Sequence, residues 1–371
     1  SHGRTAWDNG ILIMDSRMGG PVLTAIHAPE WGGLHGFVAR GAARLAAEGW
    51  PLIVVTPSDP QADEASRRLA ENHVDVVRVP LSRVRKTTNL ATHAHYISQF
   101  KKEIELISQL GSDRNAVICQ AIGLHHFHMM GAAKRLGLPL VWQLHGLAVP
   151  FPLRALLSLG LARMPDAIMV NGENWKWRFP GLVAAKAPII PFYAPVDAQK
   201  FASSKEKRAR AREIMGIGED ELLIGTVGNF GARKRHDVMV GAFSQVLEKV
   251  PNAKFKIFGQ SISSNEKWYA DNVLGDSRTT RLVSSGKLAI SSPPVPVSEI
   301  LCGFDIFVLT SDNEGIPLVI AEAMSAGVPI VSTRVGAISD MATPNDVARF
   351  AKRGDVSGVA REIVALCGSP A

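Results

Sequence analysis

The segment at residues 311–333, SDNEGIPLVIAEAMSAGVPIVST, decides how this chain is interpreted. It directly follows the apolar run DIFVLT at 305–310, which is typical of a buried strand. Two glutamates, Glu314 and Glu322, stand eight residues apart within the segment. Because the strand ends just before them, we expect both to lie at the carboxyl edge of a parallel sheet, where ligands bind in open α/β folds.

The residues between the two glutamates suit an anion. Gly315 permits a tight turn, and Pro317 suits the first position of a helix expected over 317–327. The first N–H groups of such a helix attract phosphate, and carboxylates on either side would bind sugar hydroxyls, so the pattern suits a nucleotide-sugar. Spacing alone favours a simpler alternative, in which Glu322 lies on a helix surface and Glu314 is a loop charge.

Length and composition indicate a globular chain of more than one domain. The 371 residues suit two domains of about 150–190 residues each. No apolar run reaches the roughly 18–20 residues that a membrane span needs, and the N-terminus lacks a signal-peptide core. The three cysteines lie far apart and do not suggest a disulfide framework. A cytoplasmic protein is therefore expected.

Short apolar runs alternate with helical patterns along the whole chain. The strands expected in the first half are continuous apolar runs, such as PLIVVTPS at 51–58, so helices should cover both faces of a parallel sheet. The same pattern starts again after the proline-rich stretch at 187–201. The prediction is two Rossmann-like, doubly wound domains that face a central cleft, 1–190 and 191–371, with a hinge near 191–195.

The segment that opened this section closely resembles the E-x7-E signature of retaining glycosyltransferases with the GT-B fold, in particular the GT4 family. The matching positions are Ser311, Glu314, Gly315, Pro317, Glu322, Ala323, Met324, Gly327, Pro329 and Gly336. The similarity continues in APEWGGLHGFVARGAARLAAEGWPLIVVT (28–56), in FYAPVDAQKF (192–201) and in GTVGNFGARKRHDVMVGAF (225–243). The resemblance implies an N-terminal acceptor domain and a C-terminal domain that binds a nucleoside-diphosphate sugar, UDP- or GDP-linked.

The resemblance also implies roles for single residues of the donor domain. Glu314 would contact the donor sugar and Glu322 the ribose, and Lys234 would neutralise the diphosphate. The family usually has an arginine where this chain has Asn229, and the neighbours of Lys234 are the candidates to replace it. The remaining donor-binding residues that the resemblance implies are Arg233, Arg235, Gly315, Ile316, Pro317 and Leu318.

In the first domain, the resemblance implies that Gly32 and Gly33 form the loop where acceptor and donor approach each other. His145 would line the donor site near the reacting sugar. Histidines at 93–95 and 125–128 invite a metal interpretation, but neither cluster has carboxylates or cysteines at ligand spacing. The family works without a bound metal, so neither a metal nor another cofactor is expected.

The distribution of charged residues does not identify the acceptor. Residues 1–190 carry 20 Lys/Arg against 14 Asp/Glu, a net +6, whereas 191–371 carry 21 against 20. The basic stretches at 82–103 and 174–179 suit a lipid surface or an anionic acceptor, or simply a solvated face. A nucleic-acid partner is disfavoured because the second half is nearly neutral and no known motif occurs.

Two alternatives to sugar transfer remain. A GT-B sugar-nucleotide epimerase would act on the nucleotide-sugar without an acceptor. A nucleotide-sugar-binding protein that has lost catalysis is the other, and Asn229 is the one residue that hints at it.

Overall fold

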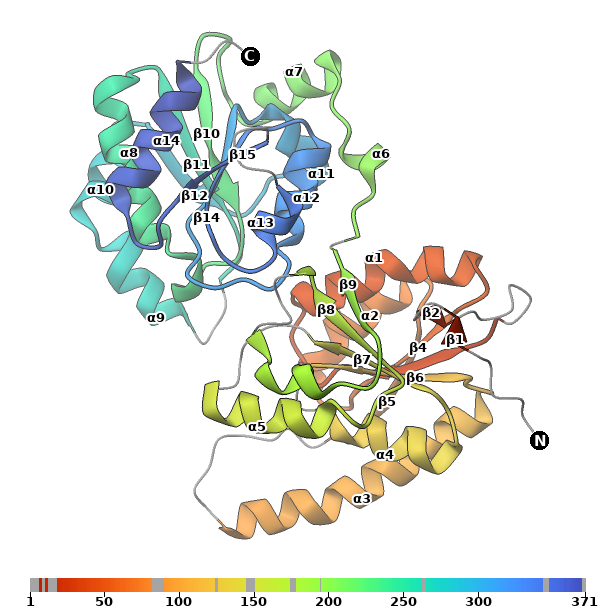
Figure 1. Cartoon of the computed structure of the whole chain (residues 1–371). Helices are drawn as coiled ribbons and strands as arrows, with labels where there is room; N and C mark the ends of the chain where they lie inside the picture. The colour runs from red at the N-terminus through yellow and green to blue at the C-terminus, as the bar shows by residue number, and fades with distance from the viewer. Residues whose placement is uncertain are drawn as a thin grey trace. The chain divides into compact units, whose positions relative to one another are not determined.

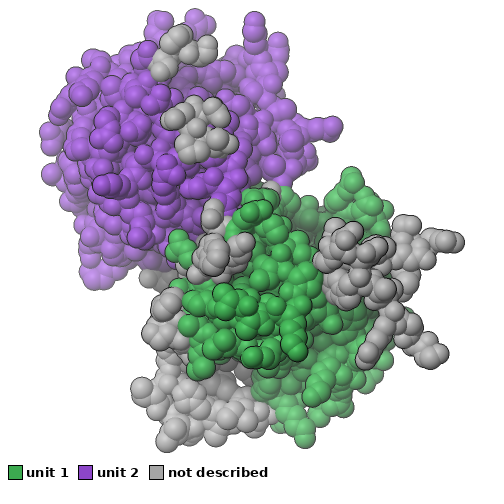
Figure 2. All heavy atoms as spheres, viewed as in Figure 1, with its two compact units in different colours: residues 1–195 green, residues 196–371 purple. Residues whose placement is uncertain are grey.

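The structure is a computed structural model of the chain, and two compact units divide it, residues 1–195 and 196–371 (Figure 2). Each unit is built on a parallel sheet with helices on both faces (Figure 1). Among the described residues, no helix combines the length and apolar character that crossing a bilayer requires. The described residues are 7–8, 11–12, 19–81, 90–123, 126–144, 151–173, 178–193, 195–261, 265–342 and 347–368.

The first unit contains a seven-stranded sheet in the order β5-β4-β3-β6-β7-β8-β9, with every neighbouring pair parallel. The order reverses at β3, because β4 and β5 extend to one side of it and β6 to the other. This confirms the doubly wound arrangement that the continuous apolar runs predicted. The strands are β3 (Val22–Ala25), β4 (Leu52–Pro57), β5 (Asp75–Val79), β6 (Ile118–Ile122), β7 (Leu140–Leu144), β8 (Ala167–Asn171) and β9 (Ile189–Phe192).

Alternate residues of one strand supply the cores on opposite faces of this sheet. In β4, Leu52 and Val54 pack with residues of α1 and α2, whereas Ile53 and Val55 pack with residues of α3, α4 and α5. Because both faces of the strand are buried, its sequence at 52–55 is a continuous apolar run. The helices are α1 (Gly33–Ala47), α2 (Asp63–Ala70), α3 (Leu90–Asp113), α4 (Phe127–Leu136) and α5 (Phe151–Leu161).

Two short strands, β1 (Trp7–Asp8) and β2 (Ile11–Leu12), pair with each other in antiparallel fashion.

The boundary between the units lies a few residues beyond the expected one. A division after residue 190 would cut through β9, whose residues pair with β8 from Ile168↔Ile189 to Asn171↔Phe192. The sequence pattern concealed this strand because Pro191 interrupts it. Proline is tolerated there because β9 is an edge strand, where a backbone N–H can be spared.

The second unit contains a six-stranded parallel sheet in the order β12-β11-β10-β13-β14-β15. The order reverses between β10 and β13, which pair directly at Ile224↔Ile306. Its strands are β10 (Leu222–Val227), β11 (Ala253–Phe258), β12 (Leu288–Ser291), β13 (Ile306–Leu309), β14 (Ile330–Thr333) and β15 (Ala348–Ala351). Its helices are α6 (Ala198–Phe201), α7 (Lys205–Ile214), α8 (His236–Lys249), α9 (Glu266–Tyr269), α10 (Ser277–Ser284), α11 (Val297–Ile300), α12 (Leu318–Ser325), α13 (Ile338–Met341) and α14 (Val356–Cys367).

Candidate active site

Two loops meet at the point where the strand order of the second unit reverses. One loop follows β10 and contains a single 3₁₀ turn, Ala232–Lys234. The other follows β13 and contains Glu314. Because β10 and β13 are neighbours, their carboxyl ends bring together side chains that are 80 residues apart in the sequence. Crevices of this kind bind ligands in open α/β sheets.

An ion pair joins the two loops. The Nζ atom of Lys234 donates to Oε1 of Glu314 at 2.7 Å, and the Oγ of Ser311 donates to the same oxygen at 2.8 Å. Glu314 is 7 % exposed, so the pair is largely shielded from water. No described residue donates to the second carboxylate oxygen, Oε2. That oxygen is therefore available to a hydroxyl of a ligand.

Glu314 is ionised at neutral pH. Burial raises the pKa of Glu314, but the charge and hydrogen bond of Lys234 outweigh burial, with smaller contributions from Arg233 and Ser311. The pKa of Glu314 consequently lies below its ordinary value. The loop after β10 thus carries a fixed ammonium, held by a neighbouring carboxylate at the edge of the sheet.

Backbone contacts hold the two loops in register. The Oγ1 of Thr310 donates to the carbonyl of Lys234 at 3.0 Å and to that of Arg235 at 2.9 Å. The backbone N–H of Asp312 donates to the carbonyl of Arg233 at 3.0 Å. The position of Lys234 is therefore fixed by the strand end of β13 as well as by its own turn.

Thr310 and Ser311 complete the site; Ser311 was expected only as a position of the signature, and Thr310 was not expected. Both are fully buried, and the Oγ1 of Thr333 donates to the carbonyl of Ser311 at 2.6 Å. The sequence signal that could have identified them is two hydroxyl residues directly after an apolar strand, since small polar groups at a strand end commonly bond the loops around them.

Of the two arginines beside Lys234, only one is uncommitted. Arg235 pairs with both Asp237 and Asp312 at 3.0 Å, so two carboxylates neutralise its charge. Arg233 is exposed and forms no ion pair with a described residue. Asn229 is also exposed, in the loop after β10. Arg233 is therefore the better candidate to supply a second cation. Arg235 is the weaker candidate for binding the donor, because its charge is already neutralised.

The second glutamate of the motif lies inside the fold. Glu322, in the second turn of α12, is only 5 % exposed, so the alternative of an exposed helix-surface residue is wrong. Pro317 is the residue before the helix (ψ 104°) and not its first residue, so the first helical N–H belongs to Leu318. The carbonyl of Gly315 accepts from the N–H of Ala337 at 3.0 Å, which holds the preceding loop extended.

Gly336 packs directly against the backbone of this loop. It has a φ of +59°, and a Cβ there would lie 2.4 Å from the carbonyl oxygen of Gly315 and 2.6 Å from that of Glu314. Both the backbone angle and the contact require glycine.

We expect Gly336→Ala to destabilise the protein by about 2 kcal/mol or more, because the added methyl group displaces the Glu314 loop. Urea unfolding of the full chain measures the loss. Gly216→Ala is the matched control, because Gly216 also has a positive φ (+64°) but meets nothing within 4 Å. Equal losses in both variants would contradict a role for the contact with the loop.

In the first unit, the expected site residues are only partly described. Gly32 precedes α1, and Gly33 is its first residue, so the glycine pair forms the start of a helix and not a separate loop. The N–H of Gly32 donates to Nδ1 of His35 at 3.3 Å. His145 and the tryptophan-rich stretch at 174–177 lie outside the described residues, as do residues 82–89.

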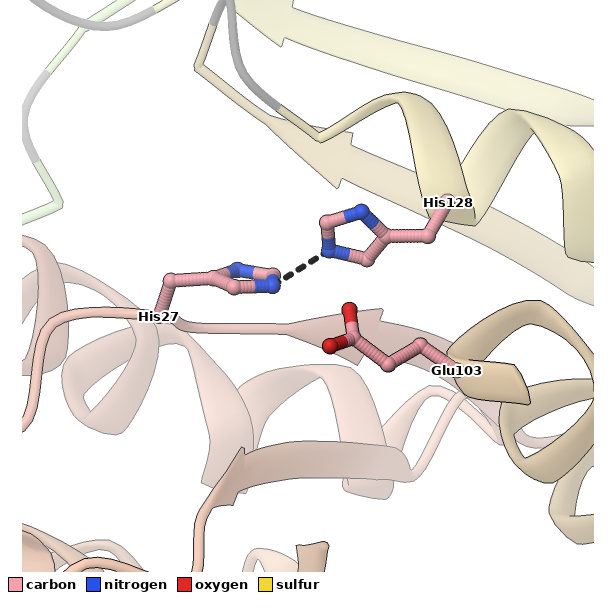
Figure 3. A group of neighbouring side chains, drawn as sticks. All are labelled: His27, Glu103 and His128. Atoms are coloured by element: carbon pink, nitrogen blue, oxygen red, sulfur yellow. Dashed lines mark hydrogen bonds between the residues drawn. The ribbon is translucent and has the colours of Figure 1, made fainter. Parts of the chain in front are cut away.

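The structure also assembles a cluster that spacing did not predict. His27 follows β3, Glu103 lies in α3 and His128 lies in α4, and one ligand-type atom from each lies within 4.8 Å of the others (Figure 3). The Nε2 atoms of the two histidines are hydrogen-bonded to each other. The ring of His126 lies 4.6 Å from that of His27, centroid to centroid.

Comparison with known proteins identifies the architecture. The structure of Anabaena HepE in complex with UDP matches with a TM-score of 0.75, over 94 % of this chain and 89 % of that chain, at 16 % identity. The fold is GT-B. Residues 221–369, which include Lys234, Glu314 and Glu322, match the family model described as Glycosyl transferases group 1.

Curated relatives of this GT-B protein are glycosyltransferases by name. The D-inositol 3-phosphate glycosyltransferase of Segniliparus rotundus is 24 % identical over 63 % of this chain and 57 % of its own length. The GDP-mannose-dependent alpha-mannosyltransferase of Mycobacterium tuberculosis is 24 % identical over 85 % of this chain and 79 % of its own length. The chain spans about half the length of the first curated relatives that it matches.

Proposed function

We propose that this GT-B protein is a retaining glycosyltransferase of the GT4 type, which moves a sugar from a nucleoside-diphosphate sugar to an acceptor hydroxyl. The observation that carries the proposal is the shielded Lys234–Glu314 pair where the strand order reverses. It lies within the segment that matches the glycosyl transferases group 1 model. The 196–371 unit would bind the donor, and the 1–195 unit the acceptor.

In the proposed reaction, the bond between the anomeric carbon and the diphosphate oxygen breaks. A bond from that carbon to the acceptor oxygen forms on the same face of the sugar. The acceptor proton passes to the departing diphosphate oxygen, so no enzyme nucleophile is required. Negative charge grows on the diphosphate as the bond breaks, and a fixed cation beside it lowers the barrier. Lys234 provides that cation.

Each remaining site residue has a role that fits its position. Oε2 of Glu314 would accept a hydrogen bond from the donor sugar, and Glu322 would bind the ribose. Arg233 would take the place of the arginine that the family usually has at Asn229. The backbone N–H groups of Gly315, Ile316 and Leu318 would bind the diphosphate.

From the first unit, Gly32, Gly33 and His145 would face the reacting sugar. Because Lys234 supplies positive charge at the diphosphate, the proposed transfer needs no metal ion there. We further propose a cytoplasmic enzyme whose basic first half, net +6, draws it to an anionic acceptor or membrane surface.

Two relatives support a UDP- or GDP-linked donor. HepE was solved with UDP, and the mycobacterial mannosyltransferase is named for GDP-mannose. A nucleotide-sugar-binding protein without transferase activity is the second candidate, and Asn229 is the residue that favours it.

A nucleotide screen by thermal shift and calorimetry tests the proposal with UDP, GDP, ADP, dTDP and their common sugars. A ligand at about 100 times its Kd adds about 2.7 kcal/mol of apparent stability. We expect one nucleotide to stabilise the wild type and Glu322→Ala to lose that stabilisation. Glu248→Ala, on the exposed surface of α8, is the control.

The outcomes separate the candidates. Absence of stabilisation by every nucleotide would overturn the donor assignment. Binding without transfer to a broad acceptor panel would support the non-catalytic protein, and Asn229→Arg would then be tested for restored transfer. Turnover of the nucleotide-sugar without an acceptor would support an epimerase.

A further inference from the structure

Three separate elements of the first unit converge where its strand order reverses. His27 lies two residues beyond the end of β3, and His128 lies in α4, which follows β6. Since β3 and β6 are neighbouring parallel strands, both histidines lie at the carboxyl edge of the sheet. Glu103 reaches the same place from α3, and Figure 3 shows its carboxylate directed toward the two imidazoles.

Two of the three side chains are buried, and the three together are chemically matched to a metal ion. Glu103 is 3 % exposed and His128 is 5 % exposed. Neutral imidazole is the form of histidine that coordinates a metal. Two imidazole nitrogens and one carboxylate oxygen are the protein ligands of many zinc sites that keep a fourth position open.

We propose that His27, Glu103 and His128 form a binding site for a divalent transition-metal ion, of which Zn²⁺ fits the ligand set best. Zn²⁺ would replace the proton that the two Nε2 atoms share. With bonds of about 2.0 Å in a tetrahedron, these nitrogens separate to about 3.3 Å. The ligand atoms already lie within 4.8 Å of one another, so small side-chain movements close the site.

The surroundings favour an ion that is bound tightly and excluded from bulk water. The ring of Phe100 lies 5.6 Å from that of His128 and shields it. The Nδ1 atom of His128 is buried and has no hydrogen-bond partner among the described residues. Hard cations are disfavoured, because Mg²⁺ and Ca²⁺ prefer oxygen ligands.

The site departs from the expectation of no metal, which rested on the spacing of histidines within each sequence cluster. The carboxylate comes from a helix 76 residues after His27, so spacing within a cluster could not find it. A bound ion would fasten α3 and α4 to the loop after β3. It lies in a different unit from Lys234 and Glu314, so the inference does not rest on the proposed donor site.

The test is Zn²⁺ binding by the full chain after treatment with EDTA and dialysis. Competition with a chromogenic chelator measures affinity, and thermal unfolding with and without ZnCl₂ measures stabilisation. MgCl₂ and CaCl₂ serve as hard-cation controls. We expect tight binding of Zn²⁺, a rise in Tm, and no comparable effect of the hard cations.

Variants assign the ion to the cluster, because the chain has 11 histidines. We expect His27→Gln, Glu103→Gln and His128→Gln each to weaken Zn²⁺ binding by at least about 100-fold. Loss of a residue that only hydrogen-bonds a metal ligand typically costs about 10–100-fold, and loss of a ligand should cost at least as much. His126→Gln is the matched control, since His126 is also buried and adjacent but is not one of the three ligands. Its effect should stay below about 10-fold.

Two results would overturn the proposal. One is a wild-type chain that Zn²⁺ neither binds nor stabilises. The other is Zn²⁺ affinity that the three ligand variants leave unchanged. Circular dichroism of each zinc-free variant shows that it is folded, and the nearly isosteric Glu103→Gln decides the question should a histidine variant fail to fold.

Discussion

Lys234→Met is expected to lower kcat by about 10²- to 10³-fold, the loss typical of removing one group that stabilises developing negative charge. The ammonium of Lys234 is fixed at 2.7 Å from Glu314 and anchored through Thr310, so in the proposed reaction it would need no reorganisation as the diphosphate departs. Methionine keeps the length and apolar stem of the side chain but removes the charge. Release of nucleoside diphosphate, from the donor that the nucleotide screen identifies, measures kcat.

Lys249→Met is the matched control for charge. Lys249 is exposed in the last turn of α8, so the same substitution there should change kcat less than about twofold. If Lys234→Met retained more than about one third of the wild-type kcat, the role assigned to the ammonium would be wrong.

The same variant should change how stability depends on pH. In the wild type, the pKa of Glu314 lies below its ordinary value near 4.5, so the ion pair adds stability above that pH and loses it as pH falls through the folded pKa. In the variant, Lys234 no longer counteracts burial, so burial raises the pKa of Glu314. The contribution of Glu314 to stability then falls as pH rises. The difference in unfolding free energy between the two proteins should therefore widen from pH 4 to pH 7. Urea unfolding at several pH values measures it, and a constant difference would contradict the coupling.

Asp305→Ala is expected to lower the free energy of unfolding by about 3 kcal/mol. The carboxylate of Asp305 binds Arg208 at 2.5 Å, Arg212 at 2.9 Å and the backbone N–H of Leu223 at 2.7 Å. The side chain of Arg212 is 12 % exposed, so removing Asp305 leaves a largely buried charge without its carboxylate partner. For a unit of this size, the loss corresponds to a fall in Tm of about 6–12 °C.

Asp305 precedes β13, at the end of the strand opposite Glu314, so stability and donor binding should separate. Below its Tm, Asp305→Ala should bind the nucleotide with nearly wild-type affinity. Asp220→Ala, at an exposed position, is the control and should lie within about 0.5 kcal/mol of the wild type. A similar Tm for Asp305→Ala and the wild type would show that the arginine network contributes little.

Apolar periodicity predicted both sheets except for two edge strands, β9 and β15. Strands such as β4 are buried on both faces, and that burial leaves a continuous apolar run that periodicity detects. The edge strand β9 was not predicted, because proline and exposed residues interrupt its apolar run where one side of the strand has no neighbour. The start of α12 was placed one residue too early because Pro317 suits both the first helical position and the residue before it.

The donor-site prediction depended on the order of residues along single segments. A strand followed by a short polar loop and a helix placed Glu314 at the sheet edge, whereas Lys234 was implied by the resemblance to GT-B glycosyltransferases. Their 2.7 Å contact could not be predicted, because it depends on β10 and β13 being neighbours. Asp237 lies only two residues from Arg235, but the second carboxylate that neutralises Arg235, Asp312, reaches it through the same pairing.

Local sequence thus specifies elements, their faces and the residues at their ends, because these follow from periodicity and steric rules within a few residues. The cluster of His27, Glu103 and His128 has no such local signal. Its members are separated by 76 and 25 residues, and they come together because β3 pairs with β6 while α3 and α4 pack on one face of the sheet. Packing between distant elements is a property of the whole unit, and only the folded chain brings those three side chains together.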